Sequence, residues 1–532
     1  MNCCSPILAI AAAGSFWFVA SIQARTLQDA SSDREGQILE IQRQIEQRNL
    51  PEANRLLDGA AKHFPDDPGL YNLRGVLAAQ QGDYDAAERD FRDAIRRAPR
   101  LTAAHLNLGR LYQEHLASDP QARRKALDIY LRVLAYEPSN AEAHYQAAVL
   151  LLEQGQYQRS LDHVLSLPSE TRASAQALSI LSADHAALGH ERSAREAAAR
   201  LVTSPELSEL DAQQSLPGLV AGKRDDLIIS LFEELQSRGS LSPASLHALA
   251  LAYERANKLT ESRAALEKYV TGGNLSVSSL LELARVAHKQ RDYQGSLGYL
   301  AHARDFEPSN ASLHYDFGLV CLDLNLVAEA RNSFEKAVTL DPENASYNYA
   351  MGAASAFRQD PAEAVPYFQK YRRLRPDDPR GPLALGAVYF RAKDYLSAAP
   401  LLLEAAAKSE TEAQAHYYLG SIALQESRLE DAHRELALAL KVQPENPDTL
   451  AQLGDYYILR KDYERAETPI RHALRIDPDH YSANFYLLTL YTRTGDARRE
   501  AQAKRFEALK TALAERAQEL LRIVEVRPFE TP

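Results

Sequence analysis

Residues 311–344 have the sequence ASLHYDFGLVCLDLNLVAEARNSFEKAVTLDPEN, and this pattern sets the expectation for most of the chain. It predicts two helices, one ending near Leu324 and the other running to about Leu340. Asp341 and Pro342 then close the pair, because proline has no N–H and disfavours helix for the residue before it. We therefore expect a helix–turn–helix unit over this stretch.

The same residue types return at a constant spacing along the chain. We call this spacing, the distance in sequence from Gly318 to Gly352, the repeat length. A small residue marks the first helix at successive steps: Ala250, Ala284, Gly318, Gly352, Gly386, Gly420 and Gly454. A second small residue follows in each unit: Ser262, Ser296, Ala330, Ala364, Ala398, Ala432 and Ala466. The unit ends carry Pro308, Pro342, Pro376, Pro444 and Pro478, with Glu410 as the exception. A fixed period of this kind predicts stacked repeats that bury surface against their neighbours.

The two small positions indicate how the helices of one unit pack. A large side chain at either position would force the two helices apart. Asp or Asn just beyond the closing proline, such as Asn344, can cap the next helix. A large apolar residue between the two helices is expected to fill the space shared with the neighbouring unit: Phe334, Phe368, Leu402, Leu436 and Ile470.

The repeat extends over most of the chain. We expect N-terminal repeats over residues 34–174, degenerate repeats over 175–242 and regular repeats over 243–514. Residues 515–532 are expected to hold the end of a capping helix and a tail. This organisation predicts an all-α solenoid, an α-α superhelix of about thirteen to fourteen units.

Two departures from the 34-residue period are visible. The step from Gly109 to Ala148 has five extra residues, which fall near 113–125 and lengthen a turn between two helices. Farther on, Pro217 followed by Gly218 is expected to cut a first helix short around Leu216. Residues 209–242 then form either a distorted helix pair or a hinge.

This pattern resembles the tetratricopeptide repeat over roughly residues 34–514. The matching motifs are the Leu-Gly pairs at 108–109, 385–386, 419–420 and 453–454, with Tyr112, Tyr389, Tyr457, Gly82-Asp83-Tyr84 and Lys393-Asp394-Tyr395. The sequence departs at the opening aromatic position, which holds Tyr71, His105, His144, Leu246, Leu280, His314, His416 and Leu450. The resemblance implies a right-handed superhelix whose concave surface, lined by first helices, binds peptides or assembles protein complexes.

Composition narrows the range of partners. The chain has 532 residues and a formal net charge of -11, which argues against the basic stripe that sequence-independent nucleic-acid binding needs. We therefore expect no nucleic-acid partner. Cys321 occupies a position where the repeat requires an apolar residue, so a buried thiol is expected there.

The N-terminus indicates export. Residues 6–22 form a long apolar run, followed by Ala24 as a cleavage position, which predicts a signal peptide over 1–24 and a short linker over 25–33. The protein would then be periplasmic or secreted. Two alternatives stay open: residues 6–22 could be retained as a membrane anchor, or the protein could be cytoplasmic.

We expect no enzyme activity, cofactor or metal site. The histidines at the opening position mostly lie several units apart, too far to share one zinc ion at ~2.0–2.1 Å, and packing explains them. The sequence has no phosphate-cradling glycine loop and no nucleophile elbow. The peptide-carboxylate clamp of some tetratricopeptide domains is also missing, because Asn72 and Asn107 fit it but Val76, Glu142 and Gln146 do not.

A tyrosine-rich run on the first helices is the candidate binding surface. Tyrosine offers a large contact area with a polar tip and loses little rotamer entropy on binding. The predicted partner-binding residues are Tyr315, Asp316, Tyr349, Arg391, Tyr417, Tyr418, Asp455, Phe485, Tyr486 and Arg493. Packing between helices is the competing explanation for these tyrosines.

The expected function is a non-enzymatic scaffold that holds a peptide segment or partner protein in the concave groove. One alternative is a cytoplasmic or membrane-anchored adaptor with the same fold. Another is an accessory subunit of a carbohydrate-processing or polysaccharide-export system, which would require a separate catalytic or barrel partner.

Overall fold

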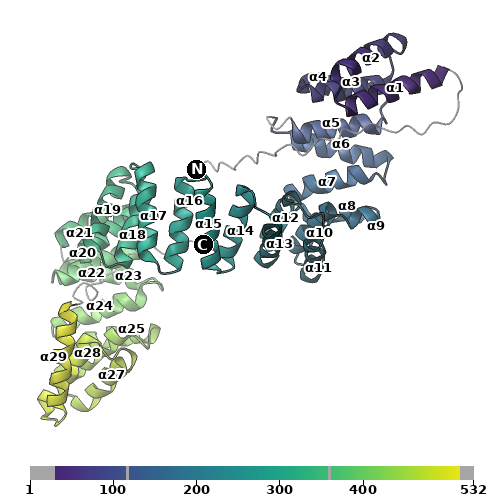
Figure 1. Ribbon diagram of the computed structural model, residues 1–532. Coiled ribbons are helices and arrows are strands. Elements are labelled where there is room, and N and C mark those ends of the chain that lie inside the picture. The colour runs from purple at the N-terminus through teal and green to yellow at the C-terminus, as the bar shows by residue number, and fades with distance from the viewer. Residues whose placement is uncertain (1–29, 116–118, 358–360, 516–532) are drawn as a thin grey trace. The chain divides into compact units, whose positions relative to one another are not determined.

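The computed structural model describes residues 30–115, 119–357 and 361–515 (Figure 1). The chain divides into two compact units, residues 1–265 and 266–532, and the division falls inside helix α15 (Leu259–Thr271). Each unit is described by itself below.

The first unit is a succession of short helices. They are α1 (Ala30–Glu46), α2 (Leu50–His63), α3 (Pro68–Gln80), α4 (Tyr84–Arg97), α5 (Thr102–Glu114), α6 (Ala122–Tyr136), α7 (Ala141–Glu153), α8 (Tyr157–Leu165), α9 (Ser169–Arg172), α10 (Ala175–Ala187), α11 (Glu191–Val202), α12 (Glu209–Ala221), α13 (Asp225–Arg238), α14 (Pro243–Arg255) and the start of α15.

The second unit continues with helices of similar length. They are α16 (Val277–Lys289), α17 (Tyr293–Phe306), α18 (Ala311–Asp323), α19 (Val327–Leu340), α20 (Ala345–Phe357), α21 (Pro361–Leu374), α22 (Arg380–Arg391), α23 (Tyr395–Ala406), α24 (Glu412–Gln425), α25 (Leu429–Val442), α26 (Pro447–Leu459), α27 (Tyr463–Ile476), α28 (Tyr481–Thr494) and α29 (Arg499–Glu515).

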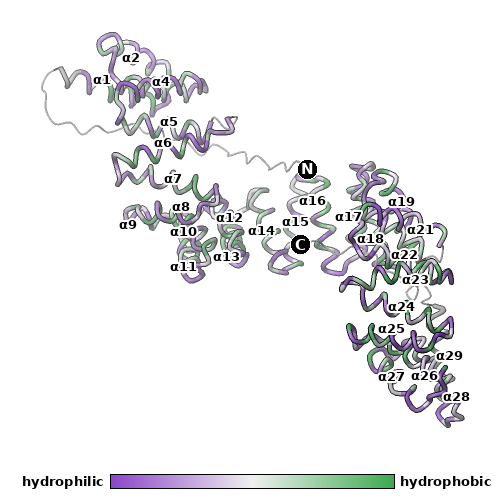
Figure 2. Tube along the Cα trace, turned by 180° about the vertical axis from the view of Figure 1, so that it is seen from behind, coloured by the Kyte–Doolittle hydropathy of each residue, from purple (hydrophilic) through white to green (hydrophobic). Residues whose placement is uncertain are grey.

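The helices are organised in antiparallel pairs. Apart from the one-turn helix α9, the 28 remaining helices of the described residues form 14 consecutive pairs, and no strand occurs among these residues. Hydrophobic and hydrophilic residues alternate along individual helices (Figure 2), as expected of helices that bury one side. These pairs confirm the predicted all-α fold and the predicted number of repeats.

The predicted helix ends are confirmed in residues 311–344. Helix α18 ends at Asp323 and α19 at Leu340, just before Asp341 and Pro342. The side-chain oxygen of Asn344 accepts hydrogen bonds from the backbone N–H groups of Ser346 (3.0 Å) and Tyr347 (3.3 Å). Asparagine therefore caps the next helix as expected.

The turns inside the pairs share a left-handed backbone conformation that the sequence analysis did not predict. Residues with left-handed φ of 54–61° recur at intervals of one repeat length, at Lys223, Asn257, Arg291 and Asn325, and again at Lys393, Ser427 and Lys461. At the Asn325 turn, the N–H of Leu326 donates to the carbonyl of Cys321 at 2.7 Å. This left-handed residue satisfies carbonyls at the end of the first helix and reverses the chain, whatever its side chain.

A close contact between the two helices of a pair explains the glycine of the repeat. A Cβ added to Gly318 would lie 2.5 Å from Cε1 of Phe334, whose ring is fully buried. Gly352 faces Phe368 in the same way, and Gly454 faces Ile470. The large residue of the second helix thus rests directly on the glycine of the first, which defines the spacing of the pair.

Helix α12 corrects one expectation. The sequence predicts that Pro217 ends this helix near Leu216, but α12 continues to Ala221. An internal proline costs a helix about 3 kcal/mol. The close packing of α12 on α10 offsets this cost, because a Cβ on Gly218 would collide with the Ala183 carbonyl oxygen. Two successive first helices therefore approach at backbone distance here.

Asp184 on α10 lies in the same irregular region. It is 0% exposed, and neither carboxyl oxygen has a hydrogen-bond partner among the described residues. Burial raises the pKa of Asp184 to about 8, and the nearby Ser160 hydroxyl, which donates to the Ala148 carbonyl (2.9 Å), opposes the shift less strongly. The carboxyl is therefore mostly protonated in the folded protein near neutral pH.

We predict that Gly318→Leu lowers the free energy of unfolding by about 1–3 kcal/mol or more, because the added side chain must displace the buried Phe334 ring. The control is Gly298→Leu on α17, where an added Cβ meets nothing within 4 Å. That change should stabilise the protein by about 0.5–1 kcal/mol through helix propensity. Thermal and urea unfolding followed by circular dichroism check both, and equal effects would contradict the packing argument.

Asp184→Val should stabilise the first unit at neutral pH by a few kcal/mol, about the cost of burying an unpaired polar group. Folded Asp184 keeps a proton that the unfolded chain loses above its ordinary pKa of 3.8. The stability of the native protein therefore falls as pH rises from about 4 to about 8 and levels off above. Hydrogen exchange of α10 in the variant and the native protein, measured across this pH range, gives the free energy of opening of each. The variant's advantage in this free energy should grow with pH, and an advantage that does not change with pH would contradict the prediction.

Candidate functional site

The predicted binding residues all lie on first helices of the second unit. Tyr315 and Asp316 belong to α18, Tyr349 to α20, Arg391 to α22, Tyr417 and Tyr418 to α24, Asp455 to α26, and Phe485, Tyr486 and Arg493 to α28. Several are separated by whole multiples of the repeat length and so share a register position: Tyr315, Tyr349, Tyr417 and Phe485 form one set, Tyr418 and Tyr486 another, and Arg391 and Arg493 a third. Equivalent positions on stacked pairs point to the same face of the stack.

Two of the tyrosines are buried in the free protein. Tyr349 is 2% exposed, and its ring contacts those of Phe368 (centroids 5.4 Å apart) and Tyr371 (4.9 Å). Tyr418 is 7% exposed and contacts Phe390 at 5.3 Å. These two side chains pack between helices and expose little surface.

The other aromatic residues present more surface. Tyr315 and Tyr417 are half-buried, as is Tyr486, while Phe485 is 46% exposed. The ring of Tyr315 contacts that of Tyr347 with centroids 5.0 Å apart, and the sequence analysis did not select Tyr347. Tyr347 lies near the start of α20 and is itself buried, so it packs beneath the half-buried Tyr315 ring.

Two carboxyl groups on this face are partly removed from water. Burial raises the pKa of Asp316 to about 6, with the Ser312 hydroxyl opposing the shift. Burial also raises the pKa of Asp455 to about 6, and the Tyr486 hydroxyl opposes that shift. Both carboxyls are therefore mostly ionised at neutral pH but lose their charge in mildly acidic solution.

Asp448 is a further acidic residue that the sequence analysis missed. It lies in the first turn of α26, one residue after Pro447, and its carboxylate accepts from Nε2 of His480 at 3.0 Å. Desolvation raises the pKa of Tyr417, and the Asp448 carboxylate adds to the shift, which places the two groups near each other. No signal in the sequence singled it out, because the equivalent position one repeat length earlier holds the uncharged Gln414.

First-helix polar residues in the first unit bind one another instead. The side-chain amide of Asn107 donates to Asn72 at 3.0 Å, and Arg110 forms an ion pair with Glu142 at 3.0 Å. The two asparagines that partly fit a carboxylate clamp are therefore engaged with each other. This pairing leaves the second unit as the better candidate for a binding face.

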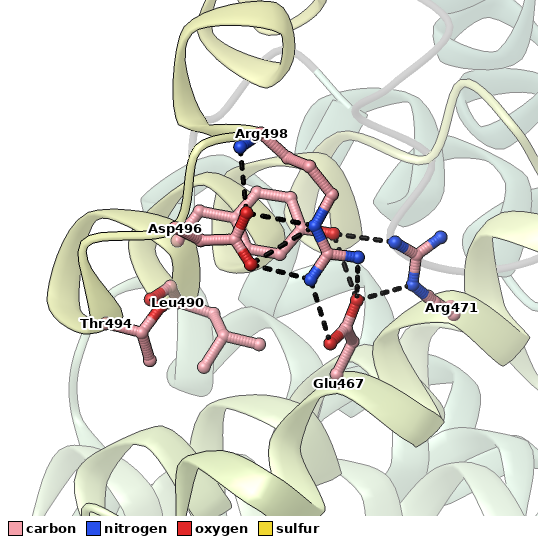
Figure 3. A network of polar contacts seen from close by, with 7 residues as sticks. Glu467, Arg471, Leu490, Thr494, Asp496 and Arg498 are labelled. Atoms are coloured by element: carbon pink, nitrogen blue, oxygen red, sulfur yellow. Dashed lines mark hydrogen bonds and ion pairs between the residues drawn. The ribbon is translucent and has the colours of Figure 1, made fainter.

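A separate polar network ties together the last pairs of the second unit (Figure 3). Glu467 on α27 accepts from Arg471 (2.6 Å) and from Arg498 (2.8 Å), and Arg498 also binds Asp496. Arg471 donates to the hydroxyl of Tyr491 on α28 at 2.7 Å. Because these charged groups satisfy one another, the network serves to hold α27, α28 and the start of α29 together.

The histidines and the cysteine occupy packing positions. His105, His144 and His314 are buried, and Nε2 of His314 lies 2.8 Å from the Pro308 carbonyl oxygen. Cys321 is a buried free thiol, as expected of a core residue. Burial raises its pKa to about 11. Within the described residues, no group of three or more potential ligands could hold a metal ion, and no helix is long and apolar enough to span a membrane.

Comparison with known proteins identifies the repeat. The sequence profile of the tetratricopeptide repeat matches residues 38–101, 73–115, 281–345, 315–379, 349–413, 383–448 and 419–481, and a second profile of the same description matches 129–162. Together these matches cover more than half of the chain. A curated relative, the Caenorhabditis elegans "Tetratricopeptide repeat protein 21 homolog", is 24% identical over 107 residues, which is 20% of this chain and 8% of that protein.

Solved structures show the same kind of fold at low identity. A tetratricopeptide repeat protein from Parabacteroides merdae has a TM-score of 0.41 and 13% identity, covering 47% of this chain and 98% of that one. The APC/C hetero-tetramer Cut9-Hcn1 has a TM-score of 0.37 and 14% identity, covering 87% and 97%. Yeast Tom70 has a TM-score of 0.36 and 16% identity, covering 85% and 98%. The likeness concerns the fold alone.

Proteins built from these repeats are generally non-enzymatic scaffolds with protein partners. The paired helices, the glycine contacts and the profile matches agree on one assignment, and the chain belongs to the tetratricopeptide repeat family.

Proposed function

We propose that this protein is a non-enzymatic interaction scaffold that holds a peptide segment or partner protein on the first helices of its second unit. The observation that supports this proposal most is Phe485, which is 46% exposed at the register position where Tyr349 is buried. Half-buried Tyr417 and Tyr486 lie on the same face. Partly exposed aromatic side chains at equivalent positions of stacked helices form the kind of surface that carries binding energy in interfaces.

The second helices supply a matched control surface. Leu396 on α23 is 90% exposed, so it is at least as accessible as Phe485 but lies on the second helix of its pair. If exposure of an apolar side chain alone caused binding, other proteins would bind equally at both positions. A partner that binds on the first helices should contact position 485 and not position 396.

We predict that a photo-crosslinking amino acid at position 485, introduced in the native host, captures a discrete partner, whereas the same group at position 396 does not. Phe485→Ala combined with Tyr417→Ala should weaken binding of the recovered partner at least about tenfold, since each removes a contact residue. Leu396→Ala should leave it unchanged. Equal crosslinking at both positions, or none at 485, would contradict the proposal.

We also propose that the protein is exported, because residues 6–22 and Ala24 have the pattern of a cleaved signal. These residues lie outside the described ones. N-terminal sequencing of the native protein is expected to find a chain that begins near Arg25. An intact Met1 would contradict cleavage, and recovery from the membrane fraction with residues 6–22 present would favour the anchored alternative.

A further inference from the structure

The surface of α24, α26 and α28 combines acidic groups with aromatic rings. Tyr417 and Tyr418 contact each other with ring centroids 5.2 Å apart at 61°, and Phe485 and Tyr486 do so at 5.6 Å. Asp455 lies on α26, the helix between these two aromatic pairs in the chain. The ring faces and carboxylate oxygens are electron-rich, which suits a positively charged ligand group.

The contacts between ionisable groups place these residues on one surface. Asp455 faces the Tyr486 hydroxyl from the neighbouring first helix. The ionisation of Tyr417 is opposed, after desolvation, by Asp448, Tyr418 and Tyr486, so its hydroxyl is close to all three. These interactions therefore connect α24, α26 and α28.

Charge is unevenly distributed along this face. Among the described residues, Asp455 forms no ion pair, and Asp448 pairs with His480 while its own side chain stays 59% exposed. Arg391 is the basic group that faces Tyr418, and it does so from α22, at the other side of α24. Around Asp455 the face therefore has acidic and aromatic groups, and no ion pair to Asp455 is present among the described residues. Arg493 is an exposed basic residue on α28, the same helix as Tyr486.

We propose that this face binds a peptide segment through a lysine or arginine side chain that lies against the Tyr417 and Tyr486 rings and reaches the Asp455 carboxylate. The inference rests on the proposed scaffold function and adds the chemistry of its ligand. A cation there regains in carboxylate and ring contacts what it loses in hydration. An acidic segment would meet Asp448 and Asp455 as like charges and be rejected.

The carboxyl group makes this binding sensitive to pH. The group that faces Asp455 is Tyr486 from α28, whose hydroxyl also meets Gln452 on α26. Tyr417 lies near Tyr486 and Asp448. Asp455 is ionised above its pKa of about 6, so it attracts a cation at pH 7.5 and does so weakly at pH 5. Binding should weaken by several-fold between these pH values.

The test is a selection of random peptides about 12 residues long, displayed on phage, against the full immobilised chain at neutral pH. The expected winners are enriched in lysine or arginine. Their synthetic forms should bind Asp455→Asn at least about tenfold more weakly than the native protein, with little pH dependence left. Asp66→Asn is the control and should bind normally, because it makes the same charge change in the first unit, at a side chain that is 91% exposed and lies 3.7 Å from Arg97.

The remaining outcomes separate this inference from the proposed function. Acidic or neutral winners that lose binding with Tyr417→Ala overturn the cation proposal but leave the scaffold proposal standing. Basic winners that Asp66→Asn weakens as much as Asp455→Asn show non-specific attraction and overturn it too. Two results would overturn both the cation proposal and the scaffold proposal. One is selected peptides that bind Tyr417→Ala, Phe485→Ala and Asp455→Asn as tightly as the native protein, and the other is that no peptide is selected. Unfolding curves of each variant confirm that the fold is intact.

Discussion

One contact sets the geometry of the regular repeats: the small residue of the first helix, glycine in units such as those of Gly318, Gly352 and Gly454, against the large apolar residue of the second. The Phe334 ring lies where a Cβ of Gly318 would be, so the two helices can approach until ring and backbone touch. Such a contact is short-ranged and intolerant of added volume, which makes the distance within each pair uniform. Uniform pairs can then be stacked with a constant repeat, and the face presented by the first helices follows from that stacking.

The irregular region shows what happens when this contact is replaced. Around α10 and α12 the close approach is made between successive first helices, through Gly218 and Gly222 against the carbonyls of Ala183 and Ala186. This packing accommodates a proline inside α12 and an unpaired carboxyl at Asp184. Tight burial elsewhere in the region outweighs two locally unfavourable features, each of which would have been a reason to expect a break.

The candidate binding face illustrates how one register position can serve two purposes. Tyr349 and Phe485 are equivalent in the repeat, yet Tyr349 is covered by Tyr371 while Phe485 stays accessible next to Phe506. The difference comes from the neighbouring helix, not from the position itself. Buried and exposed aromatic residues therefore occupy one register position in different repeats, and the half-buried acidic residues Asp316 and Asp455 also lie in different repeats.

Local sequence patterns were sufficient to predict the period, the helix pairs and the capping asparagine at Asn344. These features depend on local chemistry: small residues where helices cross, prolines where they end, and side chains that recur at each repeat. Long-range packing alone settles which tyrosines are buried, that α12 continues through Pro217, and that Asp448 joins the acidic surface. Each of these depends on contacts between residues far apart in the chain, whose balance of burial and backbone cost no local pattern records.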